Sequence, residues 1–339
     1  MARVLVIRLS AAGDVAMTIP VIYSVACNNP SSHFTFLTRA FLIPLFINRP
    51  PNLTMMAIDT GGGGMSVTSL LRFAWGCAGG DFDMVIDLHN VIRSRVLSLA
   101  FRLRGKAVHT LDKSRRERRQ LTSRRHKRTD ALRPVIERYG DVFREAGLEY
   151  KNTFTSLFDA AHPPCPPSLP GLDGEGKTTL IGIAPFAGHR GKIYPLHLME
   201  EVVAALSNRP DVRVYLLGGR GAERDTLEGL AARYVGVTSV AGLYGLDTEL
   251  AIISRLDLLV SMDSANMHFA SLVATRVISI WGATHPSGGF YGYGQAISDA
   301  IGLPLSCRPC SIYGNRPCRR RDYACLSTLP PSSVTARLI

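Results

Sequence analysis

Several features that mark other protein classes are missing from this sequence of 339 residues. No uninterrupted apolar run reaches the ~18 residues that a membrane-spanning helix requires. The amino-terminal apolar run is short and Arg8 interrupts it, so we expect no signal peptide. Seven cysteines are an odd number for a disulfide framework. These absences predict a globular protein of the cytoplasm.

Acidic residues are scarce in one segment, residues 102–128. Twelve Lys/Arg stand there against two Asp/Glu, so most of the net charge of +12 comes from this segment. Such a segment contacts something anionic or is a solvated loop. A nucleic-acid-binding protein is therefore one alternative. However, no aromatic residue lies between positions 103 and 131 to stack on bases, and no zinc-finger or helix-turn-helix pattern is present.

Length and element pattern together predict two domains. A chain of this length suits two domains of roughly 150 residues each. Residues 161–176, with Pro-Pro-Cys-Pro-Pro and several glycines, are typical of a linker. We therefore place an amino-terminal domain at residues 1–165 and a carboxyl-terminal domain at residues 177–325. The alternation of strands and helices in both halves predicts two doubly wound α/β domains that face each other across a cleft.

The first strand–loop–helix unit ends in a carboxylate. A short apolar strand over residues 3–9 precedes Ser10-Ala-Ala-Gly-Asp14, and a helical pattern follows. Gly13 allows a tight turn, and Asp14 lies at the start of the helix. Open α/β sheets bind ligands at the carboxyl ends of their strands, so Asp14 is a candidate functional residue. The alternative is that it only caps the helix.

A similar unit lies in the carboxyl-terminal half. Apolar strands at residues 258–260 and 277–281 flank a turn with Asp263 and a short helix that Ser264 is suited to cap. A helix start at a strand end favours phosphate. The Gly-rich turn at residues 218–221 also suits nucleotide phosphates or ribose. The simpler alternative is that Asp263 caps the helix and the nearby histidine is half-buried.

Metal sites are weakly indicated. Asp81-Phe-Asp83 resembles a metal-binding Asp-x-Asp, but it directly precedes a buried strand and more simply starts that strand. Four cysteines, spaced x₂, x₇ and x₆, could hold a structural zinc, stay as plain thiols or form an oxidised pair. They are Cys307, Cys310, Cys318 and Cys325. We expect no catalytic metal and no cofactor.

Four motifs in this order resemble glycosyltransferase family 9, the bacterial heptosyltransferases of lipopolysaccharide core synthesis. Residues 6–15 look like the family's strand and Ser-x-x-Gly-Asp loop, and residues 188–195 are similar to its Lys-x-Trp-Pro loop. Residues 217–223 look like its Gly-Gly-x-x-x-Glu, and residues 262–268 like its Asp-Ser-Gly-Pro-Met-His. This sequence departs from the pattern at Tyr194, which replaces Trp, and at Ala265-Asn266, which replace Gly-Pro.

The resemblance implies a GT-B fold and an inverting transfer of heptose from ADP-heptose to an inner-core lipopolysaccharide acceptor. Another nucleotide sugar stays open as donor. Asp14 would be the general base, and Lys192 would pair with the diphosphate; without the resemblance Lys192 is an ordinary surface lysine. The nucleotide sugar would contact Glu223, Asp263, Ser264, Ala265, Met267 and His268.

The acceptor is expected on the amino-terminal domain. It is anionic and membrane-anchored, so a basic segment suits both it and an anionic membrane surface. A peripheral position on the inner membrane is thus left open, and no nucleic-acid partner is expected. The predicted acceptor-binding residues are Ser10, Gly13, Asn90, Arg93, Arg115, Arg116, Arg118 and Arg119.

Overall fold

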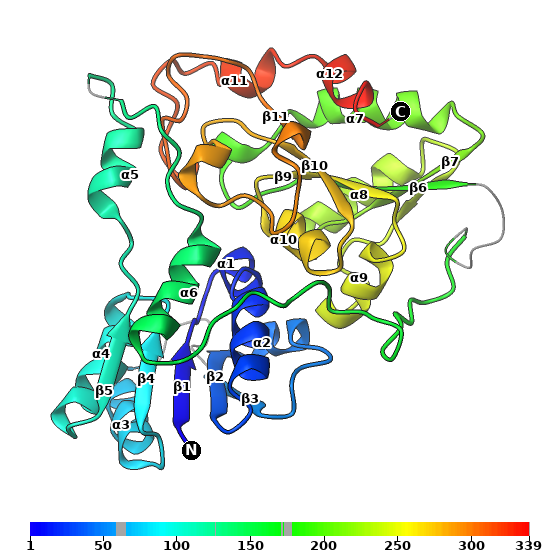
Figure 1. Cartoon of the computed structure of the whole chain (residues 1–339). Coiled ribbons are helices and arrows are strands. Elements are labelled where there is room, and N and C mark those ends of the chain that lie inside the picture. Colours follow the sequence, from blue (N-terminus) through cyan, green and yellow to red (C-terminus); the bar gives the residue numbers. More distant parts are fainter. Residues whose placement is uncertain (59–65, 126, 171, 173–177, 339) are drawn as a thin grey trace. The chain divides into compact units, whose positions relative to one another are not determined.

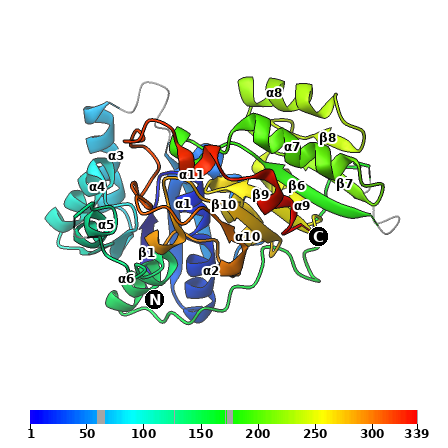
Figure 2. The same ribbon diagram turned by 90° about the horizontal axis from the view of Figure 1, so that it is seen from above.

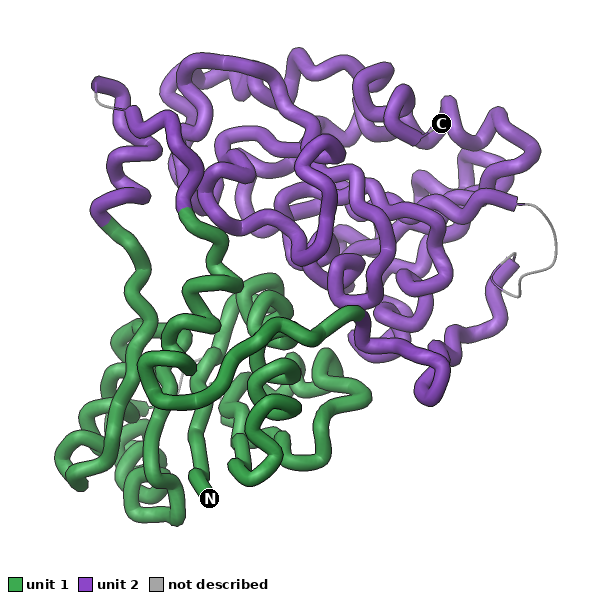
Figure 3. Tube along the Cα trace, in the orientation of Figure 1, with its two compact units in different colours: residues 1–115, 133–155 green, residues 116–132, 156–339 purple. Residues whose placement is uncertain are grey.

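The computed structural model describes residues 1–58, 66–125, 127–170, 172 and 178–338 (Figure 1). The chain forms two compact units (Figure 3). Unit 1 comprises residues 1–115 and 133–155, and unit 2 comprises residues 116–132 and 156–339. Each unit contains one parallel sheet with helices, so the predicted pair of doubly wound α/β domains is confirmed.

The sheet of unit 1 has five strands in the order β3-β2-β1-β4-β5, all parallel in their pairing. Strand β1 lies in the middle and is fully buried from Val4 to Ile7, as its continuous apolar run predicts. Its neighbours β2 and β4 therefore deliver their carboxyl ends to the same edge as β1. The strands are β1 (Arg3–Ile7), β2 (His33–Arg39), β3 (Leu53–Ile58), β4 (Met84–Asp87) and β5 (Ala107–Thr110).

Two of the helices in unit 1, α3 and α4, pack on the same face of this sheet. Leu70 of α3 and Phe101 of α4 join a buried cluster with Leu5 and Ile7 of β1. These two helices run side by side in both views (Figure 1 and Figure 2). The helices are α1 (Ala12–Ala16), α2 (Ile19–Asn28), η1 (Ala40–Leu45), α3 (Val67–Gly79), α4 (Ile92–Leu103) and α6 (Val135–Glu145).

The helical pattern after Asp14 forms two helices rather than one. Helix α1 ends at Ala16, and α2 begins at Ile19. Pro20 occupies the second position of α2, where a missing backbone N–H breaks no helical hydrogen bond. The proline therefore marks the place where the first helical segment has ended and the second begins.

The sheet of unit 2 has six strands in the order β11-β10-β9-β6-β7-β8. Strands β6 and β9 lie in the middle, and the strand predicted at residues 258–260 is confirmed as part of β9. Gly182 of β6 permits close packing, because a Cβ there would come within 2.6 Å of the Leu256 and Leu259 side chains. The strands are β6 (Thr179–Ala184), β7 (Val212–Leu216), β8 (Val237–Ser239), β9 (Leu258–Met262), β10 (Arg276–Ile280) and β11 (Ala300–Ile301).

The core of unit 2 joins β6, β7, β9 and β10 to α7, α8 and the carboxyl-terminal segment. Within the described ranges, no helix is both long and apolar enough to span a bilayer. The helices are α5 (Arg115–Leu121), η2 (Arg190–Lys192), α7 (Leu196–Ser207), α8 (Ala222–Ala231), α9 (Leu246–Ile253), α10 (Ala265–Leu272), η3 (Pro286–Gly288), η4 (Ile297–Asp299), α11 (Ala324–Ser327) and α12 (Pro331–Thr335).

The unit boundaries differ from the predicted domains in more than one place. Residues 116–132 and 156–165, which we assigned to the amino-terminal domain, belong to unit 2, and unit 2 also continues past residue 325. Lys127 donates hydrogen bonds to the carbonyl oxygens of Ser306 at 3.0 Å and Arg308 at 2.7 Å, and the Leu132 N–H donates to Ser287. Of the predicted linker, residues 171 and 173–176 lie outside the described residues, as does residue 177, the predicted start of the second domain.

Candidate active site

Asp14 is held by a buried arginine at the carboxyl end of β1. The guanidinium Nη2 of Arg8 lies 2.5 Å from the Asp14 carboxylate, and its Nη1 donates to the carbonyl oxygen of Leu88 at 2.7 Å. The Arg8 side chain is 7% exposed and that of Asp14 22%. The Ala11 N–H also points at the same carboxylate oxygen, at 3.4 Å. Asp14 is thus fixed in position and charge-paired, yet still reachable from outside.

The loop after β4 lies beside this pair because β4 neighbours β1 in the sheet. Asp87 is fully buried, and its carboxylate accepts hydrogen bonds from the backbone N–H groups of His89 and Asn90 at 2.9 and 2.8 Å. The backbone N–H of Leu9 lies 3.4 Å from His89 Nδ1. Burial, with the positive charges of Arg8 and Lys113, lowers the pKa of His89 to about 3. His89 is therefore neutral at physiological pH.

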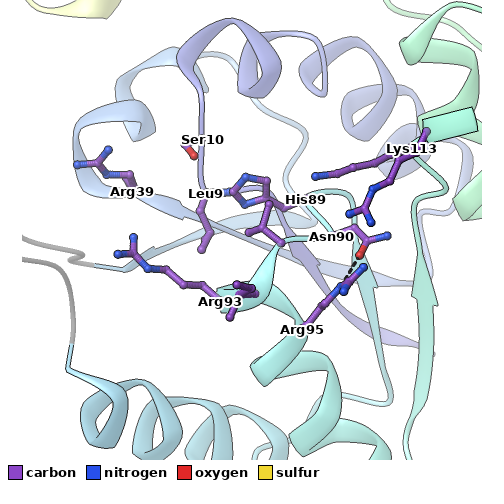
Figure 4. Close-up of a pocket in the computed structure, with 11 residues that line it drawn as sticks. Leu9, Ser10, Arg39, His89, Asn90, Arg93, Arg95 and Lys113 are labelled. Carbon is purple, nitrogen blue, oxygen red and sulfur yellow. Dashed lines mark hydrogen bonds between the residues drawn. The ribbon is translucent and has the colours of Figure 1, made fainter. Parts of the chain in front are cut away.

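A pocket of about 550 Å³ opens beside this loop within unit 1 (Figure 4). Cationic side chains project into it from several strand ends, and none of the described residues that line it carries a carboxylate. Lys113 extends toward His89 in Figure 4, and Arg95 donates to the side-chain oxygen of Asn90 at 2.8 Å. Such a lining suits an anionic ligand. Its residues are Leu9, Ser10, Arg39, His89, Asn90, Val91, Ile92, Arg93, Arg95, Lys113 and Arg115.

Four predicted acceptor residues meet in this pocket: Ser10, Asn90, Arg93 and Arg115. Gly13 does not line it and is the second residue of α1. The acceptor-binding residues that we predicted do not include Arg39, His89, Arg95 or Lys113. Each of them ends or follows a strand that neighbours β1 or β4, but the order of the strands in the sheet was needed to bring them together.

The predicted arginine cluster at residues 115–119 does not belong to the amino-terminal domain as a whole. Only Arg115 belongs to unit 1, and Arg116, Arg118 and Arg119 pack with unit 2. Arg118 is buried, donates to the Tyr313 hydroxyl at 2.5 Å and lies 4.9 Å from the Phe290 ring centroid. The prediction that these four arginines belong to the amino-terminal domain therefore holds for Arg115 alone. The aromatic side chains that contact Arg118 lie more than 150 residues away in the sequence, so the local sequence does not reveal these contacts.

In unit 2, Lys192 and Asp263 form an ion pair at the carboxyl ends of β6 and β9. Their Nζ and Oδ2 atoms lie 2.9 Å apart, with the Lys192 side chain 16% exposed and that of Asp263 6%. Gly314 leaves room for the lysine stem, because a Cβ there would lie 2.6 Å from Lys192 Cγ. Lys192 is thus a positioned residue and not a free surface lysine.

Helix α10 starts directly after Asp263, as predicted. Ser264 is its N-cap but makes no side-chain capping bond; its Oγ lies 3.3 Å from Ser261 Oγ. Ala265 is the first helical residue, and a helix start without a side-chain cap leaves N–H groups available for an anion. Met267 and His268 are both buried within the helix.

The Gly-rich turn after β7 is closed by Glu223. The carboxylate of Glu223 accepts a hydrogen bond from the Gly219 N–H at 2.7 Å, so one of its oxygens already stabilises the turn. A second acidic group nearby escaped prediction. Burial raises the pKa of Glu249, near the start of α9, to about 7, and the charge of Arg220 opposes this shift.

The residues that we considered as metal ligands are not arranged as a metal site. Among the described residues, no three His, Cys, Asp or Glu side chains are placed to hold a metal ion. All four cysteines of the carboxyl-terminal cluster are free thiols, and burial raises the pKa of Cys325 to about 11. Asp81 pairs with Arg3 at 2.7 Å, and Asp83 accepts from the Arg3 N–H, which fits a polar strand entry.

Two parallel-sheet α/β units of this kind are typical of the GT-B fold, and solved structures agree. The model of glycosyltransferase family 9 (heptosyltransferase) matches residues 71–318, more than half of the chain. The chain therefore belongs to this family, as its motifs predicted, and is a glycosyltransferase.

Individual relatives match over most of their length. The lipopolysaccharide core heptosyltransferase OpsX of Haemophilus influenzae is 23% identical over 83% of this chain and 79% of its own. The family 9 glycosyl transferase from Veillonella parvula has a TM-score of 0.71 at 19% identity, covering 99% of this chain and 96% of that one. E. coli heptosyltransferase WaaC with ADP has a TM-score of 0.67 at 18% identity, covering 99% and 98%.

Proposed function

We propose that this protein transfers heptose from ADP-heptose to an anionic inner-core lipopolysaccharide acceptor, with inversion at the anomeric carbon. The observation that carries the proposal is the Arg8–Asp14 pair beside a cationic pocket in unit 1. This arrangement offers a carboxylate that a substrate can reach and, next to it, a pocket that suits an anionic acceptor. Family membership and the relatives' names, which include heptosyltransferases of lipopolysaccharide core, support the sugar and the pathway.

Asp14 is the general base in this proposal. Its carboxylate takes the proton of the acceptor hydroxyl while the new glycosidic bond forms. The guanidinium of Arg8 stabilises the charged form of the carboxylate and fixes its orientation. His89, neutral at physiological pH, adds no competing positive charge next to the base.

Lys192 and the start of α10 stabilise the leaving group. As the bond from the sugar to the diphosphate breaks, negative charge develops on the nucleoside diphosphate. The ammonium of Lys192 and the N–H groups that follow Ser264 supply opposite charge there, and no catalytic metal is needed in this proposal. Asp263 positions Lys192. Glu223 binds ribose through the carboxylate oxygen that does not close the Gly-rich turn.

The pocket of unit 1 binds the acceptor's carboxylate and phosphate groups. Arginine holds such groups by paired hydrogen bonds, and Arg93, Lys113 and Arg115 line the pocket. The exposed arginines at positions 116 and 119 are the second candidate for the same role, and an acceptor assay separates the two.

The donor is tested with a panel of ADP-, UDP- and GDP-sugars. We expect thermal stabilisation and transfer with ADP-heptose and little with the other two nucleotides. Transfer from a UDP- or GDP-sugar at a comparable rate would contradict ADP-heptose as the donor, while the protein would still be a glycosyltransferase.

The acceptor site is tested with two matched charge reversals. Arg93→Glu with Lys113→Glu should raise the acceptor KM at least tenfold and leave the affinity for ADP unchanged, because ADP binds unit 2. Arg116→Glu with Arg119→Glu changes net charge by the same amount and should have little effect. If the second pair raises KM and the first does not, the acceptor binds the basic segment instead of the pocket.

A further inference from the structure

Helices α3 and α4 expose an unusual number of large apolar side chains. In the part of the chain that the structure describes, six of the twelve exposed large apolar residues lie on these two helices. Ile92 is 82% exposed, Leu103 68% and Trp75 50%. Isolated apolar residues on a surface are ordinary, but a group on two adjacent helices marks an interaction site. The six are Val67, Leu71, Trp75, Ile92, Leu99 and Leu103.

Helical spacing places these residues in rows that are separate from the core. On α3, the exposed residues recur every four positions, one turn apart, next to the buried row of Leu70 and Ala74. On α4, Leu99 and Leu103 lie opposite the buried Leu97 and Phe101. The core of unit 1 therefore does not account for the exposed rows.

The two rows belong to one surface. Helices α3 and α4 pack along each other (Figure 1 and Figure 2). The guanidinium of Arg104, just after α4, lies 4.4 Å from the centroid of the Trp75 ring on α3. We call the exposed side chains of these two helices the α3–α4 face.

The charges on this face have one sign. Neither helix contains an Asp or Glu, and exposed Arg72, Arg102 and Arg104 lie among the apolar residues. The carboxylates between the helices are engaged elsewhere: Asp81 and Asp83 bind Arg3, and Asp87 is buried. A surface of leucines and one tryptophan with an arginine fringe matches the apolar–anionic boundary of a lipid bilayer.

We propose that the α3–α4 face is a docking surface for a bilayer that contains anionic phospholipid. The leucines and Ile92 enter the outer acyl region, Trp75 lies at the headgroup level, and the arginines bind lipid phosphates. A second copy of the chain is a poorer occupant, because a symmetric contact would bring the same arginines against each other. The inference does not depend on the proposed transfer reaction, since binding is measured without substrates.

The later part of the basic segment, residues 115–128, is less suited to this role. In α5 the one apolar residue, Leu121, is buried, and so is Arg118. Lys127 is bound to backbone carbonyl groups of unit 2. When basic side chains are attracted to anionic lipid but no apolar side chain inserts, binding is weaker and more sensitive to salt.

The chain's tryptophans provide a direct probe. Trp75 is exposed, and Trp281 is 1% exposed, so the change in emission on lipid binding comes from Trp75. Adding phosphatidylcholine vesicles that contain phosphatidylglycerol should shift the emission to the blue, and brominated lipids should quench it. Vesicles of phosphatidylcholine alone should have little effect. No shift and no quenching with the anionic vesicles would overturn the proposal.

Paired variants test the apolar and the charged parts by flotation with the same vesicles. Leu99→Ser with Leu103→Ser, and separately Arg72→Glu with Arg102→Glu, should each lower the partition coefficient at least tenfold. The matched controls are Val235→Ser with Ile297→Ser, and Lys151→Glu with Arg213→Glu; all four control residues are exposed. The controls should bind vesicles within about twofold of wild type.

Three results would contradict the proposal. Wild-type binding by the Leu99→Ser/Leu103→Ser variant would show that the face is not used. Equal loss in the charge control would show that net charge alone drives binding. A solution oligomer that this Leu→Ser variant dissociates, seen by sedimentation, would show that another copy of the chain covers the face.

Discussion

Each unit places a carboxylate beside a cation at the carboxyl end of a central strand, but the two pairs are built differently. In unit 1 the cation and carboxylate are close in sequence: Arg8 directly follows β1, Asp14 lies in the first turn of α1, and the carboxylate keeps 22% exposure. In unit 2 the cation of Lys192 comes from the crossover after β6, and Asp263 is 6% exposed. Similar sheet topology thus supports two kinds of site.

The difference in exposure separates two chemical roles. A base must reach a substrate hydroxyl, so its carboxylate needs an open side, which Asp14 has. Asp263 is enclosed, and what it presents is the ammonium of Lys192. Sequence alone suggested that both carboxylates face substrate directly. The structure favours a substrate role for Asp14 and a positioning role for Asp263.

The substitution Asp14→Asn tests the difference between the two carboxylates most directly. Loss of the proposed base should lower kcat by about 10²–10⁴-fold, while ADP affinity stays close to wild type because the proposed ADP site lies in unit 2. Steady-state kinetics and calorimetry with ADP measure the two quantities. Turnover within a few-fold of wild type would remove Asp14 from the base role.

Lys192→Ala should produce the opposite pattern. Losing a charge-assisted contact with the diphosphate should weaken ADP binding by about 10–100-fold. Asp263→Ala should weaken it less, because Lys192 is then misplaced but still present. If calorimetry gives wild-type ADP affinity for both folded variants, the nucleotide site lies elsewhere.

Arg8→Met tests what the cation of unit 1 does. Without the neighbouring guanidinium the carboxylate form of Asp14 is less favoured, so the acid limb of the kcat/KM–pH profile should move up by about 1–3 pH units. Arg8→Lys, which keeps the charge, should move it less. A fall in kcat/KM with an unmoved acid limb would mean that Arg8 only supports the loop.

The smallest effect is expected at Glu249. Burial raises its folded-state pKa from 4.5 to about 7, so this group's contribution to stability is present below pH 4.5 and is lost as the pH rises through 7. Glu249→Gln stays neutral. Its free energy of unfolding, relative to wild type, should therefore increase by about 1–3 kcal/mol between pH 4.5 and 8. A difference from wild type that does not change with pH, in urea titrations, would contradict the shift.

Local patterns predicted much of the fold. Strand β9 and the short helix α10 after Asp263 lie where the sequence placed them, because buried apolar runs and helix-capping residues are visible in sequence. The sequence analysis did not predict helices α3 and α4 or strand β5. The exposed rows of α3 and α4 carry leucine and tryptophan where a surface helix normally has polar residues, so the amphipathic pattern is blurred.

The candidate site was predicted in its parts but not in its assembly. The motifs indicated Asp14, Lys192 and Asp263, since strand ends and glycine turns are visible in sequence. The membership of Arg39, Arg95 and Lys113 in one pocket follows from strand order, which sequence spacing does not reveal.

The sequence by itself determined the family, the two α/β halves and the residues that carry charge at the strand ends. Tertiary structure alone decided which of those charges are available. Arg118 packs against Phe290 and Tyr313, and Asp263 is enclosed with Lys192, whereas Asp14 stays open beside the pocket. The physical reason is that exposure and ion pairing depend on residues distant in the chain, and only folding brings those together.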